Sequence, residues 1–188
     1  FYDEPSSTIS NVVFMGMGEP LDNPVAVAEA IRIFTDPYGL KMAMRKISVS
    51  TAGHLDGLDR LLEHVPNVSL AISLHSPFES ERSRIMPINK RFPLSQLVAK
   101  LRQLSQVYNR SFLIQYTLIA GVNDSDEHAF ALVNLLADLP VKINVIPLNE
   151  VGPSRLRAPD ATKIAKFRNI LHAGGLRTMV RYSKGQDI

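Results

Sequence analysis

Residues 112–148 read FLIQYTLIAGVNDSDEHAFALVNLLADLPVKINVIPL, and this stretch decides the fold class. It opens with a β-branched and aromatic run, Phe112 to Ile119, of the kind that forms strands. Asp124-x-x-Glu127 then resembles a capping box at a helix start, and one apolar helical face follows at Ala129, Leu132, Val133 and Leu136. A second strand pattern runs from Lys142 to Leu148. Because parallel neighbouring strands need a long connection, which a helix supplies, the stretch predicts a β-α-β unit.

The same alternation runs through the rest of the chain. Further strand patterns lie at Asn11 to Met15, Lys46 to Thr51, Val68 to Leu74 and Arg177 to Ser183. Helical patterns lie between them, after Asn23-Pro24 and over Leu55 to Val65, Leu94 to Leu104 and Ile164 to Leu171. This predicts an α/β fold with a mainly parallel sheet and outer helices. Periodicity leaves undecided whether the sheet is open or curls toward a barrel. With no repeat and no linker, residues 1–188 are expected to form one domain.

Composition favours an ordinary globular protein. The chain has 188 residues, 45% hydrophobic and 21% charged, a balance typical of packed domains. A net charge of +3 with a pI near 9.3 permits an anionic partner but falls short of a basic nucleic-acid-binding tail. No apolar stretch approaches the roughly 18 residues that span a bilayer, and the opening FYDEPSS lacks a signal-peptide pattern. We expect a cytoplasmic protein with no membrane partner, and a monomer.

The sequence contains no cysteine. It therefore holds no disulfide, no thiolate nucleophile and no cysteine-ligated metal. The five histidines include no pair at i and i+4, the spacing of two metal ligands on one helix face. We expect neither a catalytic nor a metal-binding residue within this chain.

Polar residues gather where the predicted strands end. Glu19 follows the first strand in VVFMGMGEP, Ser50 ends the second, Ser73 and His75 end the third, and Asn149 follows INVIPL. In parallel α/β folds chemistry is found at the carboxyl ends of the strands. A carboxylate suits a ligand ammonium, while hydroxyls and an amide suit ribose, carboxylate or base edges. The alternative is that these residues only cap helices.

A phosphate cradle is disfavoured at the first of these strand ends. The pattern Gly16-x-Gly18-x-x-Leu21 lacks the third glycine of a dinucleotide-binding turn. Glu19 stands where a pyrophosphate would sit, and like charges repel.

Seven blocks of sequence carry a family resemblance: MGMGEPLDNP, ISVSTAG, AISLHSP, RSRIMPINKRFP, LIAGVND, INVIPLN and VRYSKGQDI. Together they resemble the radical S-adenosylmethionine RNA methyltransferases of the RlmN/Cfr family, across essentially the whole chain. The resemblance implies an incomplete (β/α)6 barrel that uses S-adenosylmethionine and a four-iron four-sulfur (4Fe-4S) cluster. It also implies methylation of an adenine ring carbon in 23S rRNA and, in some members, tRNA, with an electron donor such as flavodoxin.

The resemblance also implies roles for individual residues. Gly18 and Glu19 match the segment that holds the methionine end of the cofactor. The remaining cofactor positions match Ser50, the triplet Ser73, Leu74 and His75, and Asn149. The family's cluster-binding cysteines and its methyl-carrying cysteine have no counterpart here. We therefore expect a central and C-terminal barrel fragment that lacks the first strand and cluster loop and is inactive alone. The alternative is a natural cysteine-free relative that lost catalysis.

Two basic groups are candidates for RNA contact. Arg82, Arg84, Lys90 and Arg91 flank MPIN, and Arg155 and Arg157 follow Asn149. Arginine and lysine supply most sequence-independent affinity for RNA, although a solvated basic surface is the alternative.

The sequence is compatible with three functions. We favour methylation at adenine C2 over C8, because INVIPLNEVG and VRYSKGQDI look more like the C2 members. The run SPFESERSRIMPINKRFPL instead looks more like the C8 members. A non-catalytic RNA- or nucleoside-binding module is the second function. A cysteine-independent aldolase or isomerase barrel is the third, and it lacks the strand-end lysine such enzymes use.

Overall fold

The computed structural model describes residues 9–149 and 155–182. The chain divides into two compact units. Unit 1 comprises Phe1–Thr51 with Asp56–Leu70, and unit 2 comprises Ala52–Leu55 with Ala71–Ile188. Ser183, the predicted end of the last strand, lies outside the described residues. The expectation of one domain over residues 1–188 stays a prediction.

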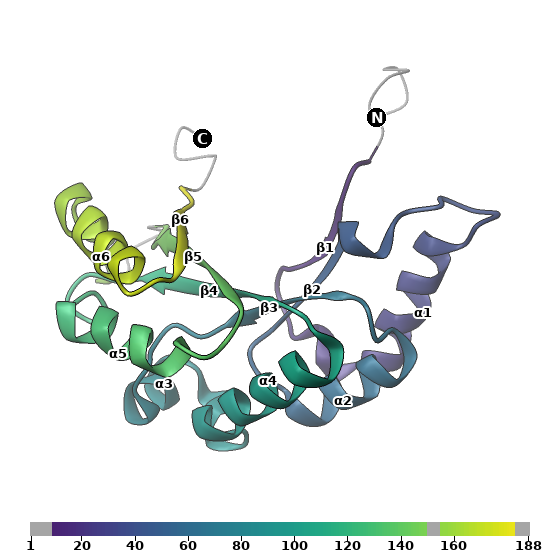
Figure 1. The fold of residues 1–188 in the computed structure, drawn as a ribbon, viewed down its shortest axis with the longest axis horizontal. Helices are drawn as coiled ribbons and strands as arrows, with labels where there is room; N and C mark the ends of the chain where they lie inside the picture. The colour runs from purple at the N-terminus through teal and green to yellow at the C-terminus, as the bar shows by residue number, and fades with distance from the viewer. Residues whose placement is uncertain (1–8, 150–154, 183–188) are drawn as a thin grey trace. The chain divides into compact units, whose positions relative to one another are not determined.

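From residue 9 onward, unit 1 contains a pair of parallel strands and two α-helices (Figure 1). Strand β1 spans Val12–Phe14 and pairs with β2, Ile47–Thr51, so that Phe14 lies opposite Val49. Between them come the short 3-10 helix η1 (Pro20–Asp22), the helix α1 (Pro24–Thr35) and the 3-10 helix η2 (Met44–Lys46). Helix α2, Leu55–His64, follows β2. A helix therefore makes the connection that the parallel pair requires.

The core of unit 1 comes from alternate strand residues and one helical stripe. Ile47 and Val49 of β2 have no exposed surface, as expected for a strand whose alternate side chains face the interior. Ile31 of α1 and Leu58 of α2 are equally buried. The guanidinium of Arg32 donates to the carbonyl oxygen of His64 at 3.4 Å and connects the ends of the two helices.

The described residues of unit 2 contain four parallel strands that pair in chain order. Strand β3 spans Ser69–Ser73, with Ala71 as its first residue in this unit, and β4 spans Phe112–Leu118. They are followed by β5, Val141–Pro147, and β6, Arg177–Val180. Each neighbour is parallel, and the register places Ser73 opposite Gln115 and Gln115 opposite Asn144.

Helices connect the strands of unit 2. The segment from β3 to β4 holds α3 (Glu79–Ile85), the 3-10 helix η3 (Pro87–Lys90) and α4 (Leu94–Tyr108). Helix α5 (Asp126–Leu136) connects β4 to β5, and α6 (Ala161–Ala173) precedes β6. Helices α5 and α6 lie side by side (Figure 1). The apolar stripe predicted for α4 is buried, at Leu94, Leu97, Val98, Leu101 and Leu104.

The start of α5 differs from the predicted capping box. Ser125 is the N-cap residue, and its hydroxyl accepts from the backbone N–H of His128 at 3.3 Å. Asp124 instead accepts from the backbone N–H of Gly121 at 2.9 Å and pairs with Lys163 at 3.0 Å. The capping prediction was therefore wrong by one residue, because Asp124 closes the preceding turn and leaves the cap position to Ser125.

The predicted fold class is confirmed. All described strands in both units run parallel to their neighbours, and helices alternate with them along the chain. In residues 9–149 and 155–182, none of the helices has the length and apolar character to cross a bilayer.

Candidate functional site

In unit 1, the predicted cofactor residues lie at the carboxyl ends of both strands. Gly18 and Glu19 follow β1, and Ser50 is the residue after Val49, the partner of Phe14. Gly18 has φ of 101°, a conformation that favours glycine, and open space where a Cβ would stand. This backbone therefore leaves room for a close ligand contact.

The carboxylate of Glu19 has a local structural role as well. It is the N-cap of η1, and its Oε1 accepts from the backbone N–H of Leu21 at 3.1 Å. Capping anchors the side chain at the strand end and fixes its direction. Glu19 is half-buried, and a charge at such a position is screened less than one in open water. The alternative of a helix cap and the prediction of a ligand contact are thus compatible.

In unit 2, the other predicted residues lie at the ends of neighbouring strands. Ser73 is the last residue of β3, and its hydroxyl donates to Oε1 of Gln115 at 3.5 Å. Leu74 has no exposed surface, and its backbone N–H continues the ladder to Gln115 at 3.0 Å. Asn149 is exposed two residues after Pro147, the end of β5. All of these residues lie at the carboxyl edge of the unit 2 strands.

His75 is the centre of a tight turn directly after β3. The backbone N–H of Ser76 donates to the carbonyl oxygen of Leu74 at 2.8 Å, and φ of His75 is 59°. A γ-turn with positive φ at its central residue is rare and strained. Such strain persists only where surrounding contacts hold it, and it is concentrated at functional sites.

Unit 2 holds His75 from two sides. The backbone N–H of Thr117 donates to Nδ1 of its ring at 2.9 Å, and Nδ2 of Asn123 donates to its carbonyl oxygen at 2.7 Å. Burial and, to a smaller extent, the positive charge of Arg82 lower the pKa of His75 to about 4. The imidazole is therefore uncharged at neutral pH.

Arg82 was expected to be exposed and to contact RNA, but it lies in the interior of unit 2. Its side chain has no exposed surface. Nε donates to the carbonyl oxygen of Leu74 at 3.1 Å, and Nη2 donates to those of Ser73 at 3.1 Å and Ala52 at 2.6 Å. Nη1 donates to Oδ1 of Asn89 at 2.5 Å. A buried guanidinium engaged in this way cannot reach a phosphate, so we leave Arg82 out of the proposed RNA surface.

The buried position also affects the charge of Arg82. Burial lowers the pKa of Arg82 to about 10, and the nearby carboxylate of Glu79 partly opposes this effect. Glu79 does not pair directly with the guanidinium, because its Oε1 accepts from Nδ2 of Asn89 at 2.6 Å and from the backbone N–H of Leu94 at 3.0 Å. Asn89 thus bridges the two charges, and Arg82 is a cation at neutral pH.

The other basic candidates are exposed. Arg84, Lys90 and Arg91 lie on and after α3, and Arg155 and Arg157 lie in the segment before α6. The guanidinium of Arg91 lies 4.8 Å from the ring centroid of Phe92, a distance typical of a cation–π contact. Contact with RNA stays a prediction for these five residues.

Sequence reasoning missed two residues that build the turn at His75. Thr117 and Asn123 belong to β4 and to the loop after it. Asn123 is fully buried, and its Oδ1 also accepts from the backbone N–H of Ile119 at 2.7 Å. A polar residue in the loop after a strand, in LIAGVND, was the available signal. Its contact with His75, 48 residues away, could not be seen without the fold.

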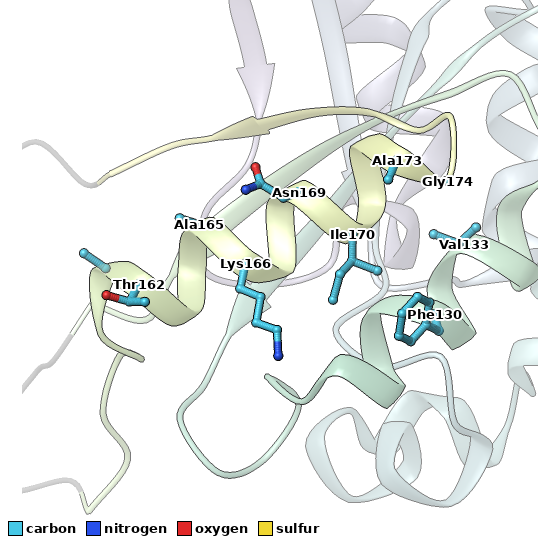
Figure 2. A pocket seen from close by; sticks show the side chains of 10 residues that line it. Phe130, Val133, Thr162, Ala165, Lys166, Asn169, Ile170, Ala173 and Gly174 are labelled. Atoms are coloured by element: carbon cyan, nitrogen blue, oxygen red, sulfur yellow. The ribbon is translucent and has the colours of Figure 1, made fainter.

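A groove lies elsewhere in unit 2, between α5 and α6 (Figure 2). Phe130 and Val133 of α5 and Ala165, Lys166 and Ile170 of α6 are among its lining residues. None of the predicted cofactor residues lines it. The described residues also contain no group of three or more His, Asp or Glu side chains placed to hold a metal ion.

Comparison with known proteins identifies relatives of this chain. No family model matches it. It is 42% identical over 98% of its length to a protein named probable dual-specificity RNA methyltransferase RlmN from Moorella thermoacetica, and covers 52% of that protein. It is 41% identical over 98% of its length to the dual-specificity RNA methyltransferase RlmN of Sorangium cellulosum, and covers 48% of it. The chain therefore spans about half the length of the curated relatives it matches.

Solved structures agree with this relationship. A radical SAM methyltransferase from Sphaerobacter thermophilus matches 97% of the chain with a TM-score of 0.93 and 40% identity, and the chain covers 53% of it. A domain of pyruvate-formate lyase-activating enzyme from Bacteroides vulgatus matches 92% of the chain, with a TM-score of 0.71 and 20% identity. That domain, of which the chain covers 99%, shows the fold alone. The predicted resemblance to RlmN-type radical SAM methyltransferases is confirmed, and the chain is homologous to them over nearly its whole length.

Proposed function

We propose that this chain is the S-adenosylmethionine-binding part of an RlmN-type radical SAM RNA methyltransferase, and that the whole protein methylates C2 of adenine, with 23S rRNA and tRNA as its proposed substrates. The single observation that carries the proposal is 40–42% identity to RlmN proteins across the chain. The expected electron donor such as flavodoxin, the monomeric state and the cytoplasmic location belong to the same proposal.

The residues of this chain suit S-adenosylmethionine. The carboxylate of Glu19, anchored by its cap on η1, is the partner that the cofactor's ammonium requires. Gly18 leaves open space beside it. Ser50, Ser73, His75 and Asn149 offer hydroxyl, imidazole and amide groups at strand ends. These polar groups suit the cofactor's carboxylate, ribose and adenine. Leu74 is included as the residue between Ser73 and His75, because its own backbone groups already bond to Gln115, Ser76 and Arg82.

The residues of this chain do not suit an iron–sulfur cluster. Cluster irons are held by cysteine thiolates, and the sequence has none. Any cluster of the whole protein must therefore be held by residues outside this chain. We infer that residues 1–188 bind cofactor only weakly and have no methyltransferase activity by themselves.

The RNA is proposed to contact the exposed basic residues Arg84, Lys90, Arg91, Arg155 and Arg157. Their guanidinium and ammonium groups would neutralise phosphates without reading sequence. Mutating one of them should weaken RNA binding and reduce its salt dependence.

The test is to express the complete gene in a strain that lacks its own RlmN and to analyse rRNA and tRNA nucleosides by mass spectrometry. We expect 2-methyladenosine with the complete gene and none with residues 1–188 alone. Appearance of 8-methyladenosine would instead assign the second regiochemistry. If neither nucleoside forms although the protein carries its cluster, the non-catalytic RNA- or nucleoside-binding module is the better function.

A further inference from the structure

The strained turn at His75 is held on each side by a side chain from another element. Arg82, from α3, donates through Nε to the carbonyl oxygen of Leu74, the residue before the turn centre. Asn123, from the loop after β4, donates to the carbonyl oxygen of His75 itself. The peptide groups before and after His75 are therefore both fixed. Since a positive φ is unfavourable for a residue with a Cβ, these contacts are what keep the turn in place.

The third contact determines where the imidazole carries its proton. The backbone N–H of Thr117 points at Nδ1 at 2.9 Å, so Nδ1 must offer a lone pair. In a neutral imidazole the proton then lies on Nε2. Within the part of the chain that the structure describes, no hydrogen-bond acceptor for Nε2 is found. The ring therefore presents a fixed N–H donor at the carboxyl end of β3.

Arg82 contributes to this arrangement through geometry and charge together. Its planar guanidinium donates to the carbonyl oxygens of Ser73, Leu74 and Ala52, the last in the loop after β2. It also donates to the side-chain oxygen of Asn89. All of these partners are neutral, so the positive charge stays beside His75 and disfavours a second proton on the ring. A lysine cannot form such a planar fork.

We propose that Arg82 is a positioning residue of the cofactor site: it holds the His75 turn, so that the imidazole, already among the cofactor positions, presents its Nε2–H to an acceptor atom of S-adenosylmethionine. This inference rests on the proposed function of the chain as a cofactor-binding part. The acceptor can be a ribose oxygen or ring nitrogen of the nucleoside, or an oxygen of the cofactor's carboxylate. All three take a hydrogen bond from an imidazole N–H.

The first measurement is the tautomer of His75 in the chain labelled with 15N, read by long-range 1H–15N NMR from pH 7.5 to pH 4. We expect the Nε2–H form throughout most of this range and a titration midpoint at about 4. The exposed His172 provides an internal reference. An Nδ1–H tautomer at pH 7 would overturn the donor role.

The second measurement compares variants at Arg82. Arg82→Met removes both the planar guanidinium and its charge. Arg82→Lys removes the planar group but keeps the charge, so we expect it to disturb folding less. We expect both to change the His75 NMR signature and to lower the affinity for S-adenosylmethionine at least tenfold. Arg168→Met, an exposed arginine on α6, is the matched control and should change neither. A folded Arg82 variant with the wild-type signature and affinity would make Arg82 merely structural.

The third measurement tests the donor and locates its acceptor. His75→Phe should lower S-adenosylmethionine affinity at least tenfold, whereas His75→Gln retains an N–H donor and should recover part of it. Equal affinities of all three chains would overturn the donor role. If methylthioadenosine, which lacks the amino-acid group, shows the same losses, the acceptor lies in the nucleoside. Losses with S-adenosylmethionine alone assign the carboxylate.

The outcomes separate this inference from the function on which it rests. If the wild-type chain binds neither compound, the cofactor role of His75 fails together with cofactor binding by this chain. The effect of Arg82 variants on the His75 tautomer still decides the positioning role, because that readout needs no ligand.

Discussion

The phenol hydroxyl of Tyr116 donates to the backbone carbonyl oxygen of Asn123 at 2.8 Å, and neither residue has exposed surface. This bond ties β4 to the loop that follows it. The side chain of the same Asn123 reaches back to His75 and to Thr117. One buried loop thus connects the centre of the unit 2 core to the strained turn of the candidate site.

Tyr116 gives a prediction for alkaline pH. Burial, with smaller contributions from Glu81 and Asp124, raises the pKa of Tyr116 well above its usual value. The unfolded chain ionises this phenol near pH 10 and the folded chain does not, so its contribution to stability is complete below pH 10 and lost as the pH rises further. Tyr116→Phe should remove this pH dependence and cost about 1 kcal/mol at pH 8 for the lost bond.

Urea unfolding of wild type and Tyr116→Phe at pH 8 and pH 11 measures both effects. The exposed Tyr182, changed to Phe, is the control. Identical losses of stability between pH 8 and pH 11 in wild type and Tyr116→Phe would contradict the prediction.

His75 gives a prediction for acid pH with the opposite direction. Its folded-state pKa of about 4 lies below the unfolded value of 6.5, so the unfolded chain binds the proton more readily. Stability from this residue is therefore complete above pH 6.5 and lost as the pH falls toward 4, by up to about 3 kcal/mol. His75→Gln should flatten this acid limb in chemical denaturation curves, while His172→Gln should leave it intact. An unchanged acid limb in His75→Gln would count against the buried neutral ring.

Asn89 gives a prediction for the stability of the Arg82 network. Its amide accepts from Arg82 and donates to Glu79 and Ser83, so Asn89→Ala leaves buried polar groups without partners. Loss of one member of a buried charged network costs on the order of 3 kcal/mol. Thermal and urea unfolding measure this cost. The control Asn134→Ala, at an exposed position of α5, should stay within about 0.5 kcal/mol of wild type; equal effects would refute the network.

Gly174 gives a prediction for the contact between α5 and α6. A Cβ added at Gly174 would stand 2.5 Å from both Cγ1 and Cγ2 of Val133. Figure 2 labels both residues among those that line the groove. Gly174→Ala should therefore destabilise by about 1–3 kcal/mol. In the double variant with Val133→Ala, the added methyl should be much less costly, and this coupling is the decisive readout. Gly39→Ala, whose Cβ would meet no atom closer than 3.5 Å, is the control.

Glu19 gives a prediction for the cofactor. Glu19→Gln keeps an acceptor oxygen for the backbone N–H of Leu21 but removes the negative charge. Loss of a charge-assisted hydrogen bond should weaken S-adenosylmethionine binding by on the order of 1 to 3 kcal/mol. Calorimetry on the chain measures this change, with Asp22→Asn, an exposed acid in η1, as the control. Unchanged affinity in Glu19→Gln, or an equal loss in Asp22→Asn, would argue against a specific ammonium partner.

Local pattern was sufficient to predict most of the elements. The strand expected at Lys142 to Leu148 is observed at Val141–Pro147, and the stripe expected on α4 is the buried one. Side-chain periodicity follows directly from backbone geometry, so residues close in sequence reveal which face is buried. The errors fall at the ends, as at Ser125, where a one-residue change in capping depends on what the neighbouring turn requires.

The sequence by itself determined the order of strands and helices, the strand-end positions of Glu19, Ser73 and Asn149, and the resemblance to RlmN proteins. Only the tertiary structure decided that Arg82 is buried and that Thr117 and Asn123 hold His75. The physical reason is that exposure and hydrogen-bond partners depend on contacts between segments distant in sequence. An arginine in a basic stretch of sequence is predicted to be exposed. Only the folded structure shows the carbonyl oxygens that accept its hydrogen bonds and allow it to be buried.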